Sequence, residues 1–231
     1  MRIVILTLAA IGIAITFHAP IVGMLLVAPL FIATLKPNVQ WLGPVVFRVP
    51  TPEKEVWITI DDGPTDDTLA VLDLLDREGV KACFFVKGVL AEAHPELVRA
   101  IVERGHAVGN HSHTHPSGTW WCLPPGAIAR EIDRCSAAIP PTRLFRAPVG
   151  HKNLFVHPAL RKRGMQLIGF SARAFDAVER NPDVIAARIV KSLSPGGIVL
   201  LHQGREWSIP AIEKTIHAIR ERGYGFLKTN R

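Results

Sequence analysis

Short apolar runs along the chain alternate with longer segments in which apolar residues recur at helical spacing. Seven runs have the β-branched and aromatic composition that is typical of buried strands. They cover residues 56–60, 82–86, 107–110, 144–146, 166–171, 198–202 and 224–227. Helices are predicted between these runs, and several end at a glycine, which commonly follows a helix C-terminus. They cover residues 69–78, 96–104, 158–163 and 209–222, and Pro95, Pro125 and Pro182 stand where a first helical turn tolerates proline.

This alternation of strands and helices predicts an α/β domain with a parallel sheet. An open doubly wound sheet and a barrel both fit the pattern, and the polar residues that follow the strands favour the barrel. In an α/β barrel the carboxyl ends of all strands meet at one face, whereas an open sheet spreads them along a crevice. We therefore predict a distorted seven-stranded (β/α) barrel. The residues at or just after strand ends are Asp61, Asp62, His111, Arg146, Asp176 and His202.

The N-terminal run, residues 3–35, contains no Asp, Glu, Lys or Arg. It exceeds the ~20 residues that span a bilayer and is far longer than the ~7–15-residue core of a cleaved signal peptide. We predict an uncleaved hydrophobic membrane anchor at residues 1–36, a Pro-rich linker at 37–54 and a catalytic domain at 55–231. Pro20 and Pro29 divide the run, so a single span and a hairpin both remain. The side of the membrane that the domain occupies stays open.

Composition and charge change this picture only in part. Hydrophobic residues make up 48% of the 231 residues, and the excess lies in the N-terminal run. The net charge of +7 suggests nucleic-acid binding, but basic residues alternate with acidic ones, as in 99–104 and 220–222. We expect a solvated surface near anionic lipid or cell-wall polymer and no nucleic-acid partner. Cys83, Cys122 and Cys135 form no CxxC pair, so no disulfide framework is expected.

Two polar clusters carry the candidate chemistry. Asp61 and Asp62 end the first predicted strand, and His111 and His115 lie fifty residues further along the chain. One Asp and two His can hold a divalent metal and leave positions open, which is typical of a hydrolytic site. The second Asp is then free to act as a base. His113 is an alternative metal ligand, because alternate residues of an extended strand share a face.

Four segments resemble the motifs of the polysaccharide deacetylase family (carbohydrate esterase family four), in the order that the family has them. Residues 59–64, Thr-Ile-Asp-Asp-Gly-Pro, resemble the first motif, and residues 111–115, His-Ser-His-Thr-His, resemble the second. Residues 146–150, Arg-Ala-Pro-Val-Gly, resemble the third, and residues 200–202, Leu-Leu-His, resemble the fifth. Each string is short, but four in order make the resemblance specific. It covers residues 55–227 and implies a distorted seven-stranded α/β barrel.

The resemblance also implies a role for each matching residue. Asp62, His111 and His115 would hold a divalent metal, most often Zn2+. Asp61 would be the general base that activates water for attack on an amide carbonyl. His202 would be the acid that protonates the leaving amine, a task that suits a histidine pKa near 6.5.

Further positions are expected to shape the site. Arg146 would orient the base carboxylate, and a backbone N–H in the turn formed by Pro148, Val149 and Gly150 would bind the oxyanion. The fourth motif departs from the family, because Arg173 and Ala177 replace an Asp and a Trp while Asp176 matches. Asp176 would support either Arg146 or His202, and the shape of the acyl pocket is open.

The pair Trp120 and Trp121 follows the histidine cluster. Three interpretations remain: a platform on which a sugar ring stacks, a lip that faces the membrane, and ordinary core. We take the pair as candidate substrate-binding residues.

These features predict a metal-dependent hydrolase in a bacterial inner membrane. It would remove N-acetyl or other N-acyl groups from amino sugars of a cell-envelope polysaccharide or lipid-linked glycan, so its partner would be an N-acetylated glycan. Hydrolysis of another amide or formamide on the same scaffold is a second possibility. A non-catalytic glycan-binding barrel is a third, and it is disfavoured because both Asp61 and His202 are present.

Overall fold

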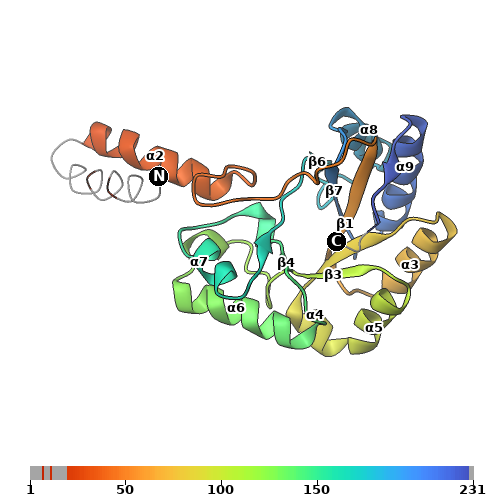
Figure 1. The fold of residues 1–231 in the computed structure, drawn as a ribbon, viewed down its shortest axis with the longest axis horizontal. Coiled ribbons are helices and arrows are strands. Elements are labelled where there is room, and N and C mark those ends of the chain that lie inside the picture. The colour runs from red at the N-terminus through yellow and green to blue at the C-terminus, as the bar shows by residue number, and fades with distance from the viewer. Residues whose placement is uncertain (1–6, 8–10, 12–19, 229–231) are drawn as a thin grey trace.

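The computed structural model describes residue 7, residue 11 and residues 20–228, and its centre is a curled parallel sheet (Figure 1). The strands are β1 (Glu55–Gly63), β2 (Ala82–Val86), β3 (Ala107–Asn110), β4 (Leu144–Phe145), β5 (Gln166–Leu167), β6 (Ala172–Arg173), β7 (Gly197–His202) and β8 (Gly225–Phe226). Their order is β5-β4-β3-β2-β1-β7-β6, and β8 pairs with β1. Every strand pair is parallel. The predicted α/β class is therefore confirmed.

Helices connect the strands. They are α2 (Pro20–Leu35), α3 (Thr68–Arg77), α4 (Gly88–Ala93), α5 (Pro95–Glu103), α6 (Pro125–Ala138), α7 (Val156–Arg161), α8 (Pro182–Lys191) and α9 (Ser208–Glu221), with 3₁₀ turns η1 (Trp120–Cys122) and η2 (Pro148–Gly150). Of these, α2 precedes the first strand, and the sequence did not predict the short α4. Pro95, Pro125 and Pro182 each begin a helix, since proline lacks only an N–H that the first turn leaves unbonded. Gly79, Gly105, Gly164 and Gly223 have positive φ after helix ends, as expected.

The sheet does not close, so the predicted barrel is a half-barrel. Its path ends at β5 on one side and β6 on the other. Of the predicted strand over 166–171, only residues 166–167 form a strand, and β6 begins just after the predicted end. Between them lies Gly169, where a Cβ would come within 2.7 Å of Asn38 Oδ1. The Gly169 N–H donates to the carbonyl of Val46 at 2.8 Å instead of to a neighbouring strand. The segment that precedes β1 therefore occupies the place where the barrel would close.

That segment was predicted as a linker, yet its first half packs on the domain. Leu42 and Val45 are buried, and Val46 forms a β-bridge with Ile168. The ammonium of Lys152, also buried, donates to the carbonyls of Lys36 and Pro37 at 2.6 and 2.9 Å. Residues 36–46 are thus part of the folded domain, because their backbone groups are bonded to it.

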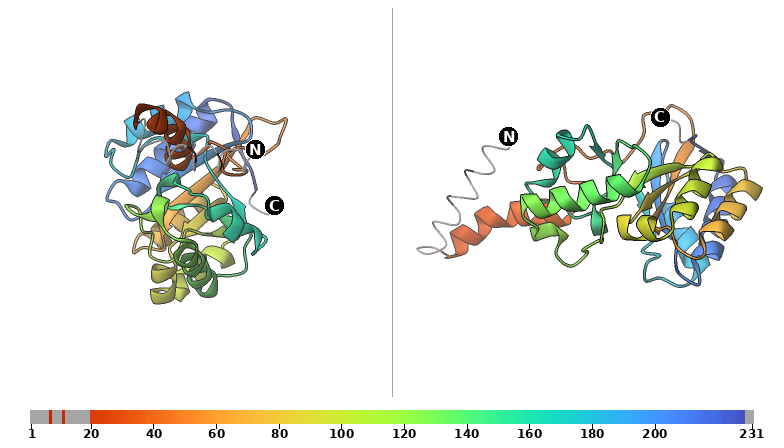
Figure 2. Two further views of the ribbon diagram at one scale, coloured as in Figure 1. Left: turned by 90° about the vertical axis from the view of Figure 1, so that its left-hand side faces the viewer. Right: turned by 90° about the horizontal axis from the view of Figure 1, so that it is seen from below.

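The helix α2 extends away from the body of the domain (Figure 2). Within the described part of the chain, no helix has the length and apolar character that crossing a membrane requires. Met24 and Leu25 of α2 are each 66% exposed, and Phe31 packs edge-on against Trp121 with ring centroids 5.8 Å apart. Residues 1–6, 8–10 and 12–19, half of the predicted anchor, lie outside the described residues.

The core surrounds β1, which pairs with both β2 and β7. Its residues 56–61 are all buried, and apolar side chains of α3, α5, α8 and α9 cover its flanks. Cys83 is fully buried, and the three cysteines are free thiols, as the lack of a disulfide framework in the sequence predicts. Because β1 is central and rigid, its carboxyl end is a well-fixed place for functional groups.

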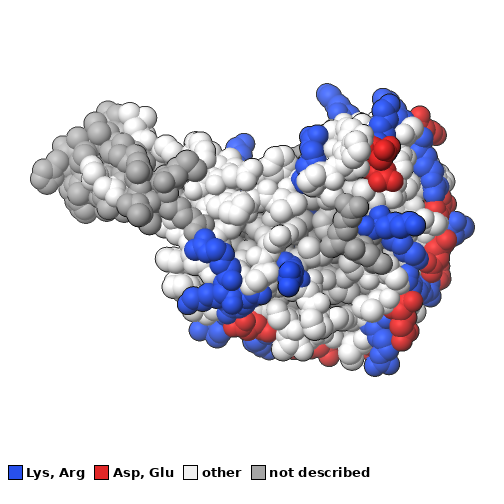
Figure 3. Space-filling model, viewed as in Figure 1, with Lys and Arg blue, Asp and Glu red and all other residues white. Residues whose placement is uncertain are grey.

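The surface carries charges of both signs. Figure 3 shows Lys and Arg interleaved with Asp and Glu along the side formed by α3, α5 and α9. Ion pairs such as Arg77–Glu213 and Arg104–Asp73 join neighbouring elements there. On this face the mixed-sign pattern of the sequence is therefore preserved in three dimensions.

Candidate active site

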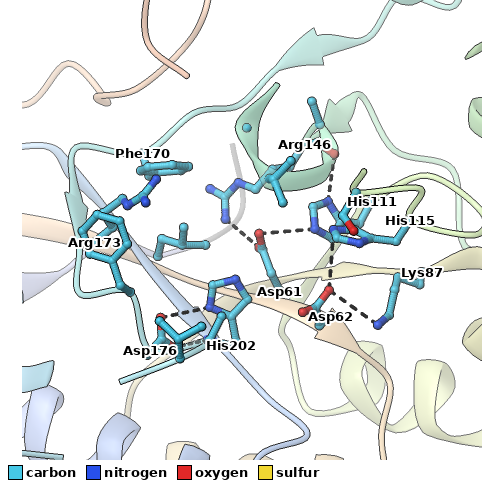
Figure 4. A pocket seen from close by; sticks show the side chains of 18 of the residues that line it. Asp61, Asp62, Lys87, His111, His115, Arg146, Phe170, Arg173, Asp176 and His202 are labelled. Atoms are coloured by element: carbon cyan, nitrogen blue, oxygen red, sulfur yellow. Dashed lines mark hydrogen bonds and ion pairs between the residues drawn. The ribbon is translucent and has the colours of Figure 1, made fainter. Parts of the chain in front are cut away.

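A cavity of about 420 Å³ opens at the carboxyl ends of the strands (Figure 4). The register of the sheet places Asp61 of β1 beside His202 of β7 and beside Phe85 of β2. The structure brings together all six polar residues that the strand ends single out. Asp61, Asp62, His111, Arg146, Asp176 and His202 all line this cavity.

A bulge lets two successive carboxylates face the same cavity. Successive side chains of a strand normally point to opposite faces. Between Asp61 and Gly63, however, the pairing of β1 with β2 shifts by one residue, and Asp62 has a φ of 76°. This left-handed conformation costs about 1–3 kcal/mol and persists only where the surroundings hold it. At Gly63 a Cβ would come within 1.9 Å of the Gln203 side chain, so any larger residue there would displace Gln203.

Asp62, His111 and His115 form a cluster whose candidate ligand atoms lie within 4.8 Å of one another. The Nδ1 of His111 is 2.9 Å from the carbonyl oxygen of Arg146, which only accepts, so Nδ1 carries the proton and Nε2 keeps its lone pair. The Nε2 of His115 lies 3.8 Å from Asp62 Oδ1. This oxygen is buried and accepts no hydrogen bond from the described residues. An open carboxylate oxygen beside two imidazole nitrogens fits a divalent cation.

Charge and burial put these groups in the protonation state that binds metal. Burial alone would raise the pKa of Asp62, but the charges of His111, Lys87, His202 and His115 outweigh it and lower the pKa to about 2. Burial lowers the pKa of His115 to about 4, helped by the charge of His111, and burial also lowers the pKa of His111. At neutral pH the carboxylate is ionised and both imidazoles are neutral, as ligands must be.

His113 is not part of this cluster. Its side chain is buried behind the loop, with Nε2 3.7 Å from Glu92, and a Cβ at Gly88 would come within 2.6 Å of its Nδ1. The backbone N–H groups of His113 and Thr114 donate to the Glu131 carboxylate at 2.9 and 2.8 Å. The alternative of His113 as a metal ligand is therefore wrong, and Glu131 of α6 holds the loop that carries His111 and His115.

Asp61 is held by a buried arginine. Arg146 is 1% exposed, and its Nη1 donates to Asp61 Oδ1 and to Thr59 Oγ1, both at 2.7 Å. Its Nη2 donates to the Gly169 carbonyl at 2.9 Å, and its guanidinium lies 4.1 Å from the centroid of the Phe85 ring. The other oxygen of Asp61 is 3.5 Å from His111 Nε2. Asp61 is thus fixed on one side and faces the metal cluster on the other.

His202 is paired with Asp176. Its Nδ1 donates to Asp176 Oδ1 at 2.9 Å, and its backbone N–H donates to the other carboxylate oxygen at 2.7 Å. Burial alone would lower the pKa of His202, but the hydrogen bond and charge of Asp176 outweigh it, so the pKa is raised. Of the two partners expected for Asp176, the structure selects His202 rather than Arg146.

The turn η2 forms one wall of the cavity. Val149 has a φ of 49° and lines the cavity with Gly150, whereas Pro148 is buried behind them. The Gly150 N–H donates to the carbonyl of Ala147 at 2.9 Å. The Val149 N–H therefore remains the donor of this turn that an oxyanion would use.

The tryptophan pair lies outside the cavity. Trp120 is fully buried and packs on Phe145 with ring centroids 5.8 Å apart, so its assignment to substrate binding is wrong. Trp121 is 38% exposed, faces Phe31 of α2 and does not line the cavity. The 3₁₀ turn η1 rotates the two rings to different sides, which the adjacent positions in the sequence did not reveal.

Sequence reasoning missed several residues of the cavity. Lys87, whose Nζ is 3.5 Å from Asp62 Oδ1, directly follows β2. The strand-end argument that selected Asp61 would have found it too. Arg173 was noted only as a departure from the family and given no role. Phe170, Phe175 and Arg205 also line the cavity.

A second group of candidate ligands lies on the outer helices. Glu78, Glu213 and His217 offer ligand atoms within 4.8 Å of one another. Unlike Asp62, both carboxylates are already paired with arginines, Glu78 with Arg220 and Glu213 with Arg77. Ion pairing accounts for this group without a metal.

Fold and site together describe an α/β half-barrel with a candidate metal-hydrolase centre, and comparison with known proteins identifies its family. Residues 48–168 match the family model described as polysaccharide deacetylase. A peptidoglycan-N-acetylglucosamine deacetylase from Bacillus cereus is 31% identical over 201 residues, covering 84% of this chain and 94% of that protein. A chitooligosaccharide deacetylase from Bradyrhizobium is 31% identical over 194 residues, covering 74% of this chain and 87% of that protein. The chain belongs to the polysaccharide deacetylase family.

Solved structures agree with this assignment. A family 4 carbohydrate esterase from Streptomyces lividans, in complex with acetate, superposes with a TM-score of 0.70 at 30% identity, covering 75% of this chain and 91% of that chain. A family 4 pseudoenzyme from Bacillus anthracis superposes with a TM-score of 0.70 at 27% identity, covering 78% and 65% of the two chains. Because the fold is shared by an esterase and a pseudoenzyme, activity must be argued from the site residues.

Proposed function

We propose that the chain is a metal-dependent deacetylase that removes N-acetyl groups from amino sugars of a cell-envelope glycan. The observation that carries the proposal is that candidate metal ligands, a candidate base and a candidate acid surround one cavity. Asp62, His111 and His115 cluster at one side. Asp61 is paired with Arg146, and His202 lies beside Asp61 in the neighbouring strand. The names of the Bacillus and Bradyrhizobium relatives support an N-acetylated glycan as the substrate.

Asp62, His111 and His115 would hold the metal. One carboxylate and two neutral imidazoles suit Zn2+ among the common divalent ions. When bound, the metal supplies Lewis acidity, which makes water a nucleophile at neutral pH. The Arg146 carbonyl fixes the tautomer and orientation of His111, which keeps its Nε2 available to the cation.

The other residues move protons and bind charge. Asp61, oriented by Arg146, accepts the proton of the attacking water. The Val149 N–H binds the oxygen that becomes negative as the carbonyl carbon turns tetrahedral. His202, whose protonated form Asp176 stabilises, donates the proton of its Nε2 to the departing nitrogen, so the amide bond breaks to leave a free amine and acetate.

Replacing the base tests this proposal. Asp61→Asn keeps the shape and the Arg146 contact of the side chain but removes the proton acceptor. We expect acetate release from N-acetylglucosamine oligosaccharides and from peptidoglycan to fall about 10²–10⁴-fold, while the bound metal content stays unchanged. Asp66→Asn, at an exposed position with no side-chain partner among the described residues, is the matched control and keeps its activity. Undiminished turnover by Asp61→Asn would show that Asp61 is not the base. No acetate release by the wild type would refute the enzymatic proposal and favour a glycan-binding role.

The acyl group is a separate question, because the fourth motif is altered. Ala177 and Val178 line the cavity where the family has a larger aromatic residue in its motif. Hydrolysis of a formyl or other acyl amide is therefore the second candidate. Parallel assays that measure formate and acetate release from matched N-acyl sugars distinguish the two.

We further propose that the N-terminal run holds the domain at a bacterial inner membrane. The absence of charged side chains between residues 3 and 35 supports this, as do the exposed Met24, Leu25 and Phe31 of α2. The two relatives come from bacteria. The anchor would keep the cavity near glycans that are assembled or inserted at the membrane surface.

A further inference from the structure

Arg173 is an unpaired cation in the wall of the cavity. It ends β6 and is half-buried. Its guanidinium lies 3.7 Å from the centroid of the Phe175 ring and 5.5 Å from that of Phe170. Its guanidinium makes no hydrogen bond and no ion pair with any residue between 20 and 228. Its five N–H donors are therefore available to a ligand.

The unpaired guanidinium of Arg173 differs from that of Arg146, the fully buried arginine of the cavity. Arg146 donates to Asp61, Thr59 and Gly169, so its donors are used within the protein. Arg173 is partly desolvated, and burial lowers its pKa although the charge of Asp176 opposes the change. The faces of the Phe170 and Phe175 rings offset part of the cost of this desolvation. The N–H donors at the edge of the guanidinium have no acceptor among the described residues. An anionic oxygen group would complete the site with paired N–H···O bonds.

The other charges of the cavity leave Arg173 without a counter-ion. Asp61 is paired with Arg146, and Asp176 is paired with His202. Asp62 faces His111, His115 and Lys87. Each carboxylate that lines the cavity thus already has a basic partner.

The unpaired charge lies at a definite place in the cavity. Figure 4 shows Arg173 beside Phe170, on the side away from the histidine cluster and Lys87. Arg205 also lines the cavity, is exposed, and makes no side-chain ion pair with the residues that are described. A substrate whose amide lies at the histidine cluster would therefore extend another of its groups toward a positively charged wall.

We propose that Arg173 recognises a carboxylate or phosphate carried by the glycan, so that the substrate is an acidic amino-sugar glycan rather than a neutral one. This inference rests on the proposed deacetylase function and adds the class of its substrate. Arg173 acts as a specificity-determining residue: it binds and orients the substrate, and it takes no part in the proton transfers of Asp61 and His202.

Three matched disaccharides test the inference with the full-length protein. Diacetylchitobiose is neutral, its 1-phosphate carries a phosphate, and the disaccharide of N-acetylglucosamine and N-acetylmuramic acid carries a carboxylate. For the wild-type protein we expect kcat/KM to be higher on one or both acidic substrates, and the preference to shrink as salt screens the charge. Arg173→Gln should lower kcat/KM on the preferred acidic substrate by about 10–100-fold and leave that on diacetylchitobiose unchanged. Arg173→Lys, which keeps the charge without the planar fork, should be intermediate.

A second arginine variant is the control for these measurements. Arg99→Gln removes the same charge from an exposed position on α5 and should change none of the three rates. Turnover of diacetylchitobiose by Arg173→Gln shows that the variant is folded. Equal losses on all three disaccharides, or no loss on any, would overturn the inference while leaving the deacetylase proposal intact. If the wild-type protein releases acetate from none of them, the proposed function fails instead.

Discussion

Asp176 illustrates how one buried carboxylate sets the chemistry of a neighbouring side chain. It accepts from both the ring and the backbone of His202, so the imidazolium form is stabilised where burial would otherwise disfavour it. Trp207 donates to the Asp176 carbonyl at 2.8 Å and holds the loop in place. A histidine with a raised pKa keeps its proton to a higher pH than a free imidazole, and the protonated state is the one that protonation of a leaving amine requires.

Asp176→Asn should change the pH dependence of the reaction. Because the carboxylate raises the pKa of His202, its removal lowers that pKa, and the fraction of protonated His202 declines at a lower pH. We expect the alkaline limb of the kcat/KM profile to move to lower pH and the rate at pH 8 to fall by up to about 10²-fold. A full pH–rate profile measures this, with Asp66→Asn as the control. An unmoved alkaline limb would show that His202 is not the acid.

At the scale of elements, the irregular segments position the site. The bulge of β1 turns Asp62 into the cavity. The gap between β5 and β6 leaves the Gly169 N–H free to bond the Val46 carbonyl, so that residues 38–46 pack there. The short helix turn η2 presents Val149. Regular strands and helices supply the frame, whereas the departures from regularity aim the functional groups.

The N-terminal element leads to a prediction about location. If the apolar run anchors the domain, the full-length chain should remain in the membrane pellet after both high-salt and alkaline carbonate washes. Deletion of residues 3–32, which also removes the exposed Met24, Leu25 and Phe31, should release the protein into the supernatant. Its deacetylase activity on soluble oligosaccharides should persist, because the cavity residues are all beyond residue 60. Release of the full-length chain by high salt alone would indicate electrostatic adsorption, and its presence in the soluble fraction from the start would refute the anchor.

For the whole molecule, the sheet gathers distant residues around one candidate cation site. Asp62, His111 and His115 come from the ends of two strands that are separated by β2, so a bound metal would link parts of the fold that only the native state brings together. A ligand that binds the native but not the unfolded chain stabilises it by mass action.

Zn2+ should therefore raise the melting temperature. At 100 times its dissociation constant a ligand contributes about 2.7 kcal/mol, which corresponds to about 5–10 °C for a chain of this size. Differential scanning calorimetry should show the rise for the wild type, its reversal by chelator, and its loss in His111→Asn. His217→Asn is the matched control from the outer-helix cluster and should retain the rise. If His217→Asn lost the rise and His111→Asn kept it, the metal site would instead be Glu78, Glu213 and His217.

Much of this architecture was predictable because local rules govern it. Apolar runs located β2 and β3 with their correct bounds, and prolines located the starts of α5, α6 and α8. The strand-end argument also selected six residues that line the cavity. Lys87 obeys the same rule and was overlooked.

The remaining features depend on contacts between segments far apart in the chain. Trp120 and Trp121 are equivalent by composition, and only packing against Phe145 and Phe31 separates a core residue from an exposed one. The barrel does not close because residues 38–46 pack at Gly169. The hydrophobic pattern of the sequence cannot show that two such distant segments come together.

The amino-acid order thus specified the secondary structure, the parallel sheet and the chemical types at the strand ends, because side-chain periodicity and turn residues act over a few positions. The folded chain alone established that Asp176 bonds His202, that His113 lies behind the loop of His111 and His115, and that Arg173 lacks a counter-ion. Those outcomes depend on distances and burial in three dimensions, where a partner can be more than a hundred residues away.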